Sequence, residues 1–364
     1  MPHVDPPIVL LTCGDPAGIG PEVVVKAWGV ASLHARARLR VVADAAMLAR
    51  VLAERTGLPR LGIRRIDASD GRVSAVEEVL VIEPPAAARG DVVTGRATAA
   101  GGGLAAAAVL AAATLVRAGR AQAIVTGPLH KEALRAAGYD VPGHTELLAR
   151  DCGLSDDDVS MMLWLPAESG AGGLGVVHVT LHEPLARALT RITTAGIVQA
   201  GVRLSGLLEP LLAAAPSGRR PRIAVAALNP HGGESGLFGD EEQRIVAPAV
   251  RQLQDAGVDA SGPLPADTLF LRAGRGAFDG VVALYHDQGH IPVKLLGMHR
   301  AVNITLGLPF VRTSVAHGTA FDIVGTAAAD PASMVAAIAA ATRLVAAGWP
   351  LRAAAASAAA RATP

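Results

Sequence analysis

Three histidines each follow a short apolar run that is typical of a buried β-strand: His182, His231 and His286. In open α/β sheets, ligands collect at the carboxyl ends of the strands, so three imidazoles delivered there could meet around one cation. Taken singly, each histidine is more typical of a hydrogen-bonded structural residue. Their equivalent positions together favour a divalent metal site whose open coordination positions bind substrate directly.

Other histidines in the same region fit that pattern less well. His178 lies on the opposite strand parity, which indicates a core residue, and His290 and His299 are expected in loops without a partner. Three imidazoles suit zinc, but open coordination positions also admit Mg, Mn or Co.

A candidate anion site lies at residues 142–146, where a helix is expected to begin after a turn. Backbone N–H groups and the helix dipole would face an anion there, and His144 and Thr145 would add side-chain donors. The alternative is a helix N-cap at Thr145. A capping box would require an acidic residue or Gln at position 148, which is Leu.

Further donors follow His286 along the chain. Lys294, Asn303 and Arg312 supply an ammonium, an amide and a guanidinium, which together suit a phosphate and a carboxylate; a solvated strand end is the alternative for Arg312. Only three of the 33 basic residues are lysines, the others being Lys26 and Lys131. A retained lysine suggests a compact ammonium or a transferable proton, with chance retention as the alternative.

Two glycine-containing segments could approach a ligand closely. Residues 14–22 permit a tight loop between the first strand and the first helix, but they do not form the G-x-G-x-x-G fingerprint, so no Rossmann domain is indicated. Residues 317–323 combine a glycine turn with a helix start that can hold a dinucleotide phosphate or ribose. Asp267 is interpreted equally as a buried acid that orients a ligand or as a helix N-cap.

Apolar runs bounded by Gly, Pro or Asp alternate with alanine-rich helical segments, which indicates an α/β fold. Strands are expected at residues 8–13, 39–43, 79–83, 122–126, 159–165, 174–180, 222–228, 280–285 and 301–306. Helices are expected at 20–29, 44–56, 94–118, 130–138, 144–152, 183–214 with a break near Thr193, 240–256, 267–274 and 331–348.

Composition limits the possible partners. The chain has 364 residues, enough for two domains, and its 33 basic and 32 acidic residues give no basic field for nucleic acid. Cys13 and Cys152 lie far apart, which favours free thiols in a reducing compartment. The N-terminal residues lack a secretory pattern, and the alanine-rich stretches favour buried helices over membrane spans. A cytoplasmic protein without a membrane partner is expected.

Seven stretches spread over nearly the whole chain resemble the 4-hydroxythreonine-4-phosphate dehydrogenase (PdxA) family: residues 14–22, 126–128 with Lys131, 142–146, 229–234, 262–270, 285–289 and 303–319. The resemblance implies a two-domain fold like that of isocitrate and isopropylmalate dehydrogenases, with the active site in the interdomain cleft. The first α/β domain would comprise residues 1–145 and 305–364. The second, residues 146–304, would carry the metal ligands and the interface of a homodimer.

The resemblance also assigns residues to roles. The metal ligands, shared between subunits, would be His182, His231 and His286. The substrate-binding residues would be His144, Thr145, Lys294, Asn303 and Arg312. The cofactor would be NAD or NADP, bound by a stretch that includes His317, Gly318, Thr319 and Asp322.

The implied reaction belongs to pyridoxine biosynthesis. It is a metal-assisted oxidation, with decarboxylation, of a 4-phosphorylated hydroxy acid such as 4-phosphohydroxy-L-threonine. The metal, which could be Zn, Mg, Mn or Co, lowers the pKa of the alcohol, and Lys294 or Asp267 takes its proton.

Two features depart from the family pattern. Residues 288–297 look more like the branch that acts on D-threonate or D-erythronate 4-phosphate, and Ala316 stands where the family usually has Asp. A further relative oxidises the cis-dihydrodiol of terephthalate. The rival classes are a phosphate acyltransferase of the same fold, which would need coenzyme A, and a metal-dependent hydrolase that uses the same histidines to activate water.

Overall fold

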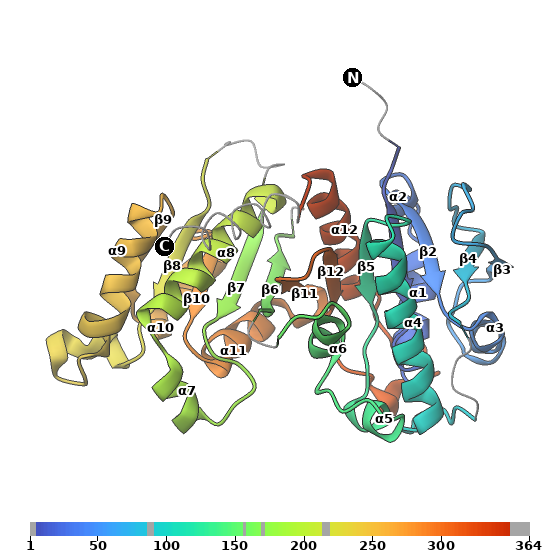
Figure 1. Ribbon diagram of the computed structural model, residues 1–364, viewed down its shortest axis with the longest axis horizontal. Coiled ribbons are helices and arrows are strands. Elements are labelled where there is room, and N and C mark those ends of the chain that lie inside the picture. The colour runs from blue at the N-terminus through green and yellow to red at the C-terminus, as the bar shows by residue number, and fades with distance from the viewer. Residues whose placement is uncertain (1–4, 86–90, 156–157, 169–171, 213–218, 350–364) are drawn as a thin grey trace. The chain divides into compact units, whose positions relative to one another are not determined.

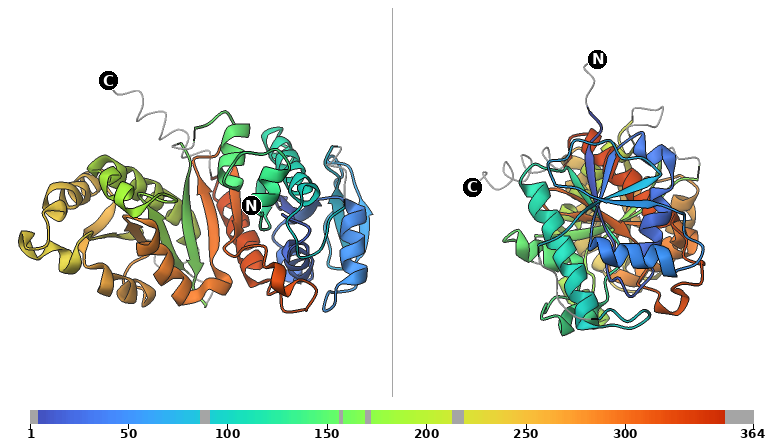
Figure 2. Two further views of the ribbon diagram at one scale, coloured as in Figure 1. Left: turned by 90° about the horizontal axis from the view of Figure 1, so that it is seen from below. Right: turned by 90° about the vertical axis from the view of Figure 1, so that its right-hand side faces the viewer.

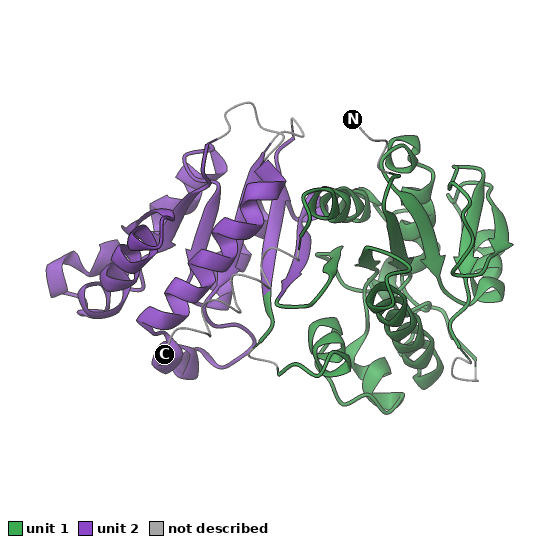
Figure 3. Ribbon diagram, turned by 45° about the horizontal axis from the view of Figure 1, so that its top comes forward, with its two compact units in different colours: residues 1–160, 307–364 green, residues 161–306 purple. Residues whose placement is uncertain are grey.

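The structure is a computed structural model that describes residues 5–85, 91–155, 158–168, 172–212 and 219–349 (Figure 1). The chain forms two compact units, drawn in different colours in Figure 3. Unit 1 comprises residues 1–160 and 307–364, and unit 2 comprises residues 161–306. The α/β fold expected from the sequence is confirmed, because helices and strands alternate along both units.

Unit 1 contains a parallel sheet with the strand order β3-β4-β2-β1-β5-β12. Its strands are β1 (Ile8–Thr12), β2 (Arg38–Val42), β3 (Gly62–Arg65), β4 (Glu78–Ile82), β5 (Ala123–Thr126) and β12 (Val311–Val315). Strands β5 and β12 are buried along their whole length, as expected for parallel strands covered on both faces. Figure 2 shows helices on both sides of these strands.

The helices of unit 1 are α1 (Gly20–Trp28), α2 (Ala31–His34), α3 (Ala45–Glu54), α4 (Ala99–Arg117), α5 (Lys131–Ala136), α6 (His144–Asp151), α12 (Ala332–Ala346) and the short η4 (Phe321–Ile323). Of the helices described, only α4 is long and apolar enough to suit a membrane span. Its alanine and valine residues pack instead into a buried cluster with residues of α5 and α6. A Cβ on Gly102 would lie 2.0 Å from the carbonyl oxygen of Ala133, so glycine allows α4 and α5 this close approach.

Unit 2 has the strand order β11-β6-β7-β10-β8-β9, in which β6 runs antiparallel to β7, and β7, β10, β8 and β9 are parallel. The strands are β6 (Ser160–Pro166), β7 (Gly173–His178), β8 (Arg222–Ala226), β9 (Asp259–Leu264), β10 (Gly280–Ala283) and β11 (Val302–Leu306). The helices are α7 (Leu185–Arg191), α8 (Thr194–Leu212), α9 (Ala247–Asp255), α10 (Ala266–Gly274) and α11 (His286–Gly297). Shorter turns are η1 (Pro230–Gly236), η2 (Glu242–Val246) and η3 (Met298–Arg300).

Every expected strand and helix is present. Strands β3 and β9 and helix α11 were not predicted, because their sequences lack the usual strand or helix pattern. Strand β3 is a charged, exposed edge, and β9 contains Gly262 and Pro263, both disfavoured in strands. Helix α11 contains Pro292, which is unfavourable inside a helix. The expected break near Thr193 is confirmed, since it separates α7 from α8.

The boundary expected at residue 145 lies later in the structure. Residues 146–160 belong to unit 1, because Leu147 and Leu148 of α6 are buried in the cluster that also contains Val109 of α4. Cys13 and Cys152 are free, as expected. Burial raises the pKa of the Cys13 thiol to about 12, so this thiol stays protonated and unreactive at neutral pH.

Candidate active site

Four histidines gather in unit 2 where β7 and β10 end. Strand β7 ends at His178, and His286 begins α11 shortly after β10. His290 lies one turn further along α11 and stacks on His286, with ring centroids 3.8 Å apart. The ring of His182 lies 5.7 Å from that of His286. The structure therefore brings together His182 and His286, two of the three predicted metal ligands.

His290 corrects a prediction. It is not a loop residue without a partner, because it lies in α11, is buried, and its Nδ1 is 3.1 Å from Nε2 of His178. The predicted burial of His178 is confirmed. Burial and the neighbouring imidazoles hold the pKa of His178 well below its usual value, and burial together with His286 and Lys294 lowers the pKa of His290 to about 4. Both rings are therefore neutral at physiological pH.

His231 lies apart from this histidine cluster. Its side chain is 64% exposed in η1, and its Nδ1 is 2.9 Å from Oε1 of Glu234. Within the part of the chain that the structure describes, no group of three His, Cys, Asp or Glu side chains is arranged to hold a metal ion. A three-histidine ligand set is thus not assembled in the single chain, and its sharing between subunits stays a prediction.

The backbone around His231 is held in an uncommon conformation. Residues 231–235 all have positive φ, with values of 52°, 74°, 80°, 43° and 58°, although only two of them are glycines. Such strain persists only where the surroundings impose it, and it is concentrated at functional sites. The strain is therefore consistent with a functional role for this turn.

A buried carboxylate holds the start of this turn. Oε1 of Glu242 accepts hydrogen bonds from the backbone N–H groups of Leu228 and Asn229, at 2.8 and 2.7 Å, and Oε2 accepts one from Nδ2 of Asn229 at 3.0 Å. Burial alone would raise the pKa of Glu242, but the donors on Asn229 and Leu228 bring it below its usual value. The sequence reasoning missed this residue, whose only local signal is an acid in the first turn of a helix.

Unit 1 contains a second group of predicted residues. Arg312 lies in β12, 3% exposed, and its Nη2 donates to Oγ1 of Thr126 at 2.6 Å. It is not a solvated strand end. His144 begins α6, and burial together with the charge of Arg312 holds its pKa well below the usual value. Burial lowers the pKa of Arg312 to about 10, against the opposing charge of Glu146.

A buried nitrogen and a helix N-terminus in this group indicate a ligand-binding site. Nε2 of His144 is buried and has no hydrogen-bond partner among the described residues. Thr145 follows in the first turn of α6, where backbone N–H groups are available to an anion. A neutral imidazole, a guanidinium and a helix start are together suited to hold a phosphate or a carboxylate.

The other predicted residues of unit 2 occupy varied surroundings. Lys294 is exposed on α11, and Asn303 is partly buried in β11. Asp267 is exposed in the first turn of α10, whose N-cap is Pro265, so it is neither a buried acid nor a helix cap. A proline before the helix, rather than the acid, sets its start.

The two glycine-containing segments meet in unit 1. The backbone N–H of Ile19 donates to the carbonyl oxygen of Thr319 at 2.9 Å, and a Cβ on Gly18 would lie only 2.6 Å from that oxygen. His317 has its Nε2 buried without a hydrogen-bond partner in the described part of the chain, and Asp322 is exposed on η4. The expected loop and the expected cofactor segment are thus neighbours.

Comparisons with known proteins give these features a context. The chain is 44% identical to the D-threonate 4-phosphate dehydrogenase of Salmonella typhimurium over 91% of this chain and 96% of that protein. It is 41% identical to the 4-hydroxythreonine-4-phosphate dehydrogenase of Bradyrhizobium diazoefficiens over 95% and 99%. The crystal structure of the Klebsiella pneumoniae 4-hydroxythreonine-4-phosphate dehydrogenase matches with a TM-score of 0.77 at 42% identity, covering 93% and 99%.

The fold and these relatives place the protein among the dehydrogenases, so it is an oxidoreductase. Residues 35–341 match the family model described as pyridoxal phosphate biosynthetic protein PdxA. The chain belongs to the PdxA family, which confirms the resemblance found in the sequence.

Proposed function

We propose that this protein is a metal-dependent, NAD(P)-linked dehydrogenase that oxidises and decarboxylates a 4-phosphorylated hydroxy acid such as 4-phosphohydroxy-L-threonine. The observation that carries the proposal is the His182–His286 pair at the carboxyl ends of the unit 2 strands. The relatives named above act on 4-hydroxythreonine 4-phosphate or D-threonate 4-phosphate. D-Threonate and D-erythronate 4-phosphate are therefore the alternative substrates.

The candidate ligands suit a divalent cation. Nδ1 of His286 lies 2.7 Å from Oδ1 of Asp287, and Nδ1 of His231 lies 2.9 Å from Oε1 of Glu234. A carboxylate on Nδ1 fixes the tautomer and leaves Nε2 for a metal, which is the usual arrangement of ligating histidines. His182, His231 and His286 would hold Zn, Mg, Mn or Co, which when bound lowers the pKa of the substrate hydroxyl.

A homodimer would complete this ligand set. Helix α10 contacts both η1 and α11 in unit 2. Large apolar side chains are exposed just after η1 and on α10 and α11: Leu237, Phe238, Leu271, Ile291, Leu295 and Leu296. Exposed apolar surface of this kind marks protein interfaces. Its position beside the exposed His231 supports a subunit interface at which the metal ligands of two chains are shared.

The chain's polar residues have separate tasks. His144, Thr145 and Arg312 hold an anionic group of the substrate, and Lys294 and Asn303 supply further donors. Lys294 or Asp267 takes the hydroxyl proton, and the exposure of both leaves either accessible to a ligand. His317, Gly318, Thr319 and Asp322 would hold NAD or NADP, which would supply the hydride acceptor. Nε2 of His317, which is buried and has no hydrogen-bond partner among the described residues, fits a ligand at that segment.

One assay separates the candidate functions. Chelator-treated protein is supplied with one divalent cation, NAD or NADP, and one of 4-phosphohydroxy-L-threonine, D-threonate 4-phosphate, D-erythronate 4-phosphate or the terephthalate cis-dihydrodiol. Metal-dependent appearance of the reduced-nicotinamide absorbance is expected. Phosphate release without nicotinamide reduction would indicate a hydrolase. In a parallel reaction supplied with an acyl phosphate and coenzyme A, acyl transfer to the thiol with release of phosphate would indicate an acyltransferase. Either result would overturn the proposal.

A further inference from the structure

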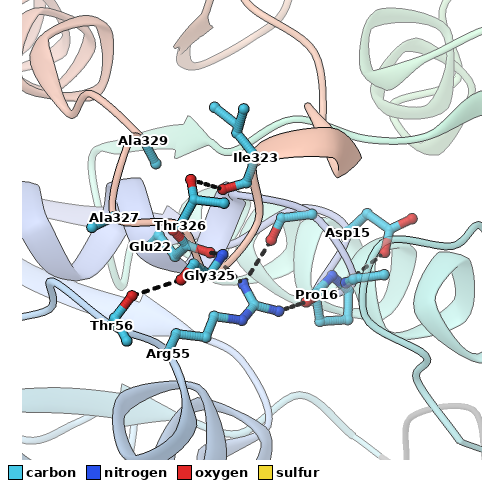
Figure 4. A network of polar contacts seen from close by, with 12 residues as sticks. Asp15, Pro16, Glu22, Arg55, Thr56, Ile323, Gly325, Thr326, Ala327 and Ala329 are labelled. Carbon is cyan, nitrogen blue, oxygen red and sulfur yellow. Dashed lines mark hydrogen bonds and ion pairs between the residues drawn. The ribbon is translucent and has the colours of Figure 1, made fainter.

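The candidate cofactor segment continues into residues 325–329 of unit 1, whose backbone is held by side chains from two other segments (Figure 4). The N–H of Gly325 donates to Oε1 of Glu22 at 2.9 Å, and Oγ1 of Thr56 donates to the carbonyl oxygen of Gly325 at 2.6 Å. Nζ of Lys26 donates to the carbonyl oxygens of Ala327 and Ala329, at 2.8 and 2.7 Å. All these contacts are made to main-chain groups, so they fix the course of the segment.

This course is not one that the segment would adopt freely. Ala327 has φ 70°, a left-handed conformation that is uncommon for residues with a Cβ. A Cβ on Gly57 would lie 2.4 Å from Cβ of Ala327, so the turn after α3 also approaches the segment closely. Because the strained residue carries one of the two carbonyls bound by Lys26, the ammonium is placed to hold this conformation.

Arg55 connects these contacts to the loop at residues 14–22. Its Nη1 donates to the carbonyl oxygen of Gly18 at 2.8 Å and to Oε1 of Glu22 at 3.1 Å, and its Nη2 donates to the carbonyl oxygen of Pro16 at 2.8 Å. The side chains of Arg55 and Glu22 are only 8% and 0% exposed. One oxygen of Glu22 therefore accepts from both Arg55 and Gly325, so a change at Arg55 is transmitted to the cofactor segment.

We propose that Glu22, Arg55 and Lys26 are positioning residues that hold residues 319–329 in the conformation that binds the dinucleotide cofactor. The inference rests on the proposed assignment of the cofactor to His317, Gly318, Thr319 and Asp322. His317 and Gly318 lie just before the segment, and Thr319 and Asp322 lie within it. The segment is held at its two ends, by Ile19 at Thr319 and by Lys26 at Ala329, and between them by Glu22 at Gly325. Loss of the network therefore weakens cofactor binding and leaves the chemical step intact.

The test compares Arg55→Met, Arg55→Lys and Lys26→Met with a matched control, Arg60→Met, which replaces an exposed arginine close to Arg55 in the sequence. Calorimetry on the metal-loaded full chain gives the Kd of NAD or NADP. Steady-state kinetics gives kcat and the KM of each substrate. Arg55→Met and Lys26→Met are each expected to raise the Kd and the KM of the cofactor about tenfold. Their kcat and their KM for the hydroxy acid should stay within about twofold of the wild-type values.

Two further readouts separate positioning from general stability. Arg55→Lys is expected to recover part of the cofactor affinity, because an ammonium can still donate to some of the same oxygens. Hydrogen exchange of the peptide covering residues 319–329 is expected to accelerate in Arg55→Met, and the Arg60→Met control should match the wild type in every measurement.

Several outcomes would overturn the inference. One is an unchanged cofactor Kd in Arg55→Met and Lys26→Met. Another is a proportional loss of kcat, of cofactor affinity and of hydroxy-acid affinity, which would indicate that Arg55 and Lys26 only stabilise the fold. If Arg55→Met does not fold, Lys26→Met decides by the same criteria. A wild-type protein that binds neither NAD nor NADP would instead refute the proposed function, so the two failures are distinguishable.

Discussion

Glu242→Gln tests whether the buried carboxylate beneath η1 controls metal binding at His231. The substitution keeps the shape of the side chain but removes the charge that accepts three hydrogen bonds from Leu228 and Asn229. If the amide oxygen keeps the two backbone donors, the new NH2 group faces the NH2 group of Asn229, so one bond is lost and two are weakened. Hydrogen bonds to charged groups contribute about 1.5–3 kcal/mol each, so a loss of ~2–3 kcal/mol in unfolding free energy is expected.

The functional consequence follows from the strained turn that this carboxylate anchors. Relaxation of residues 231–235 would move His231, and loss of support behind a ligand typically lowers metal affinity about 10–100-fold. Competition with a chromophoric chelator measures that affinity, and urea denaturation measures stability. Glu241→Gln, at the neighbouring acid that also contacts Asn229, is the matched control. Unchanged metal affinity in Glu242→Gln, despite the expected loss of stability, would refute the reasoning.

Three other predictions concern the two candidate sites and one ion pair outside them, Arg219 with Asp279 in unit 2. His231→Ala should abolish metal binding and turnover together while leaving Tm near the wild-type value, because the side chain is exposed; equilibrium dialysis and the nicotinamide assay check this. Arg312→Met should lower kcat/KM for a phosphorylated substrate about 30–100-fold through loss of a charged donor, and steady-state kinetics on the phosphorylated substrate would show it. Burial opposes ionisation of Asp279, but hydrogen bonds and the charge of Arg219 bring its pKa below the usual value. The ionised carboxylate therefore stabilises the fold at neutral pH, and this contribution is lost as the pH falls through the lowered pKa. In Asp279→Asn, the free energy of unfolding measured against pH should therefore fall less steeply on the acid side.

The sequence predicted those parts of the site that lie next to strong local patterns. His182 and His286 follow apolar runs, and the runs became β7 and β10, so their proximity was expected from the convergence of parallel strand ends. His144 was correctly expected at the start of a helix, because Pro142 and Gly143 favour a turn just before it.

The sequence could not reveal contacts that depend on tertiary packing. His290 follows Gly289 and precedes Pro292, so the expected loop concealed a helix whose packing brings His290 against His178. A Cβ on Gly289 would lie 2.3 Å from Nε2 of His178, so this glycine serves close approach rather than a turn. Arg55 gave no signal, because its partners lie more than 30 residues away and two of them are backbone carbonyls, which any residue type provides.

The buried glutamates Glu22 and Glu242 act in the same physical way. Glu22 lies in the first turn of α1 and Glu242 in the first turn of η2, and each accepts a backbone N–H from a separate segment that carries candidate ligand-binding residues. Because the acceptor binds main-chain groups, the side chains of those segments can change without loss of the anchor. Specificity can therefore vary within such a segment, whereas a change in either glutamate alters the backbone on which every ligand contact of that segment depends.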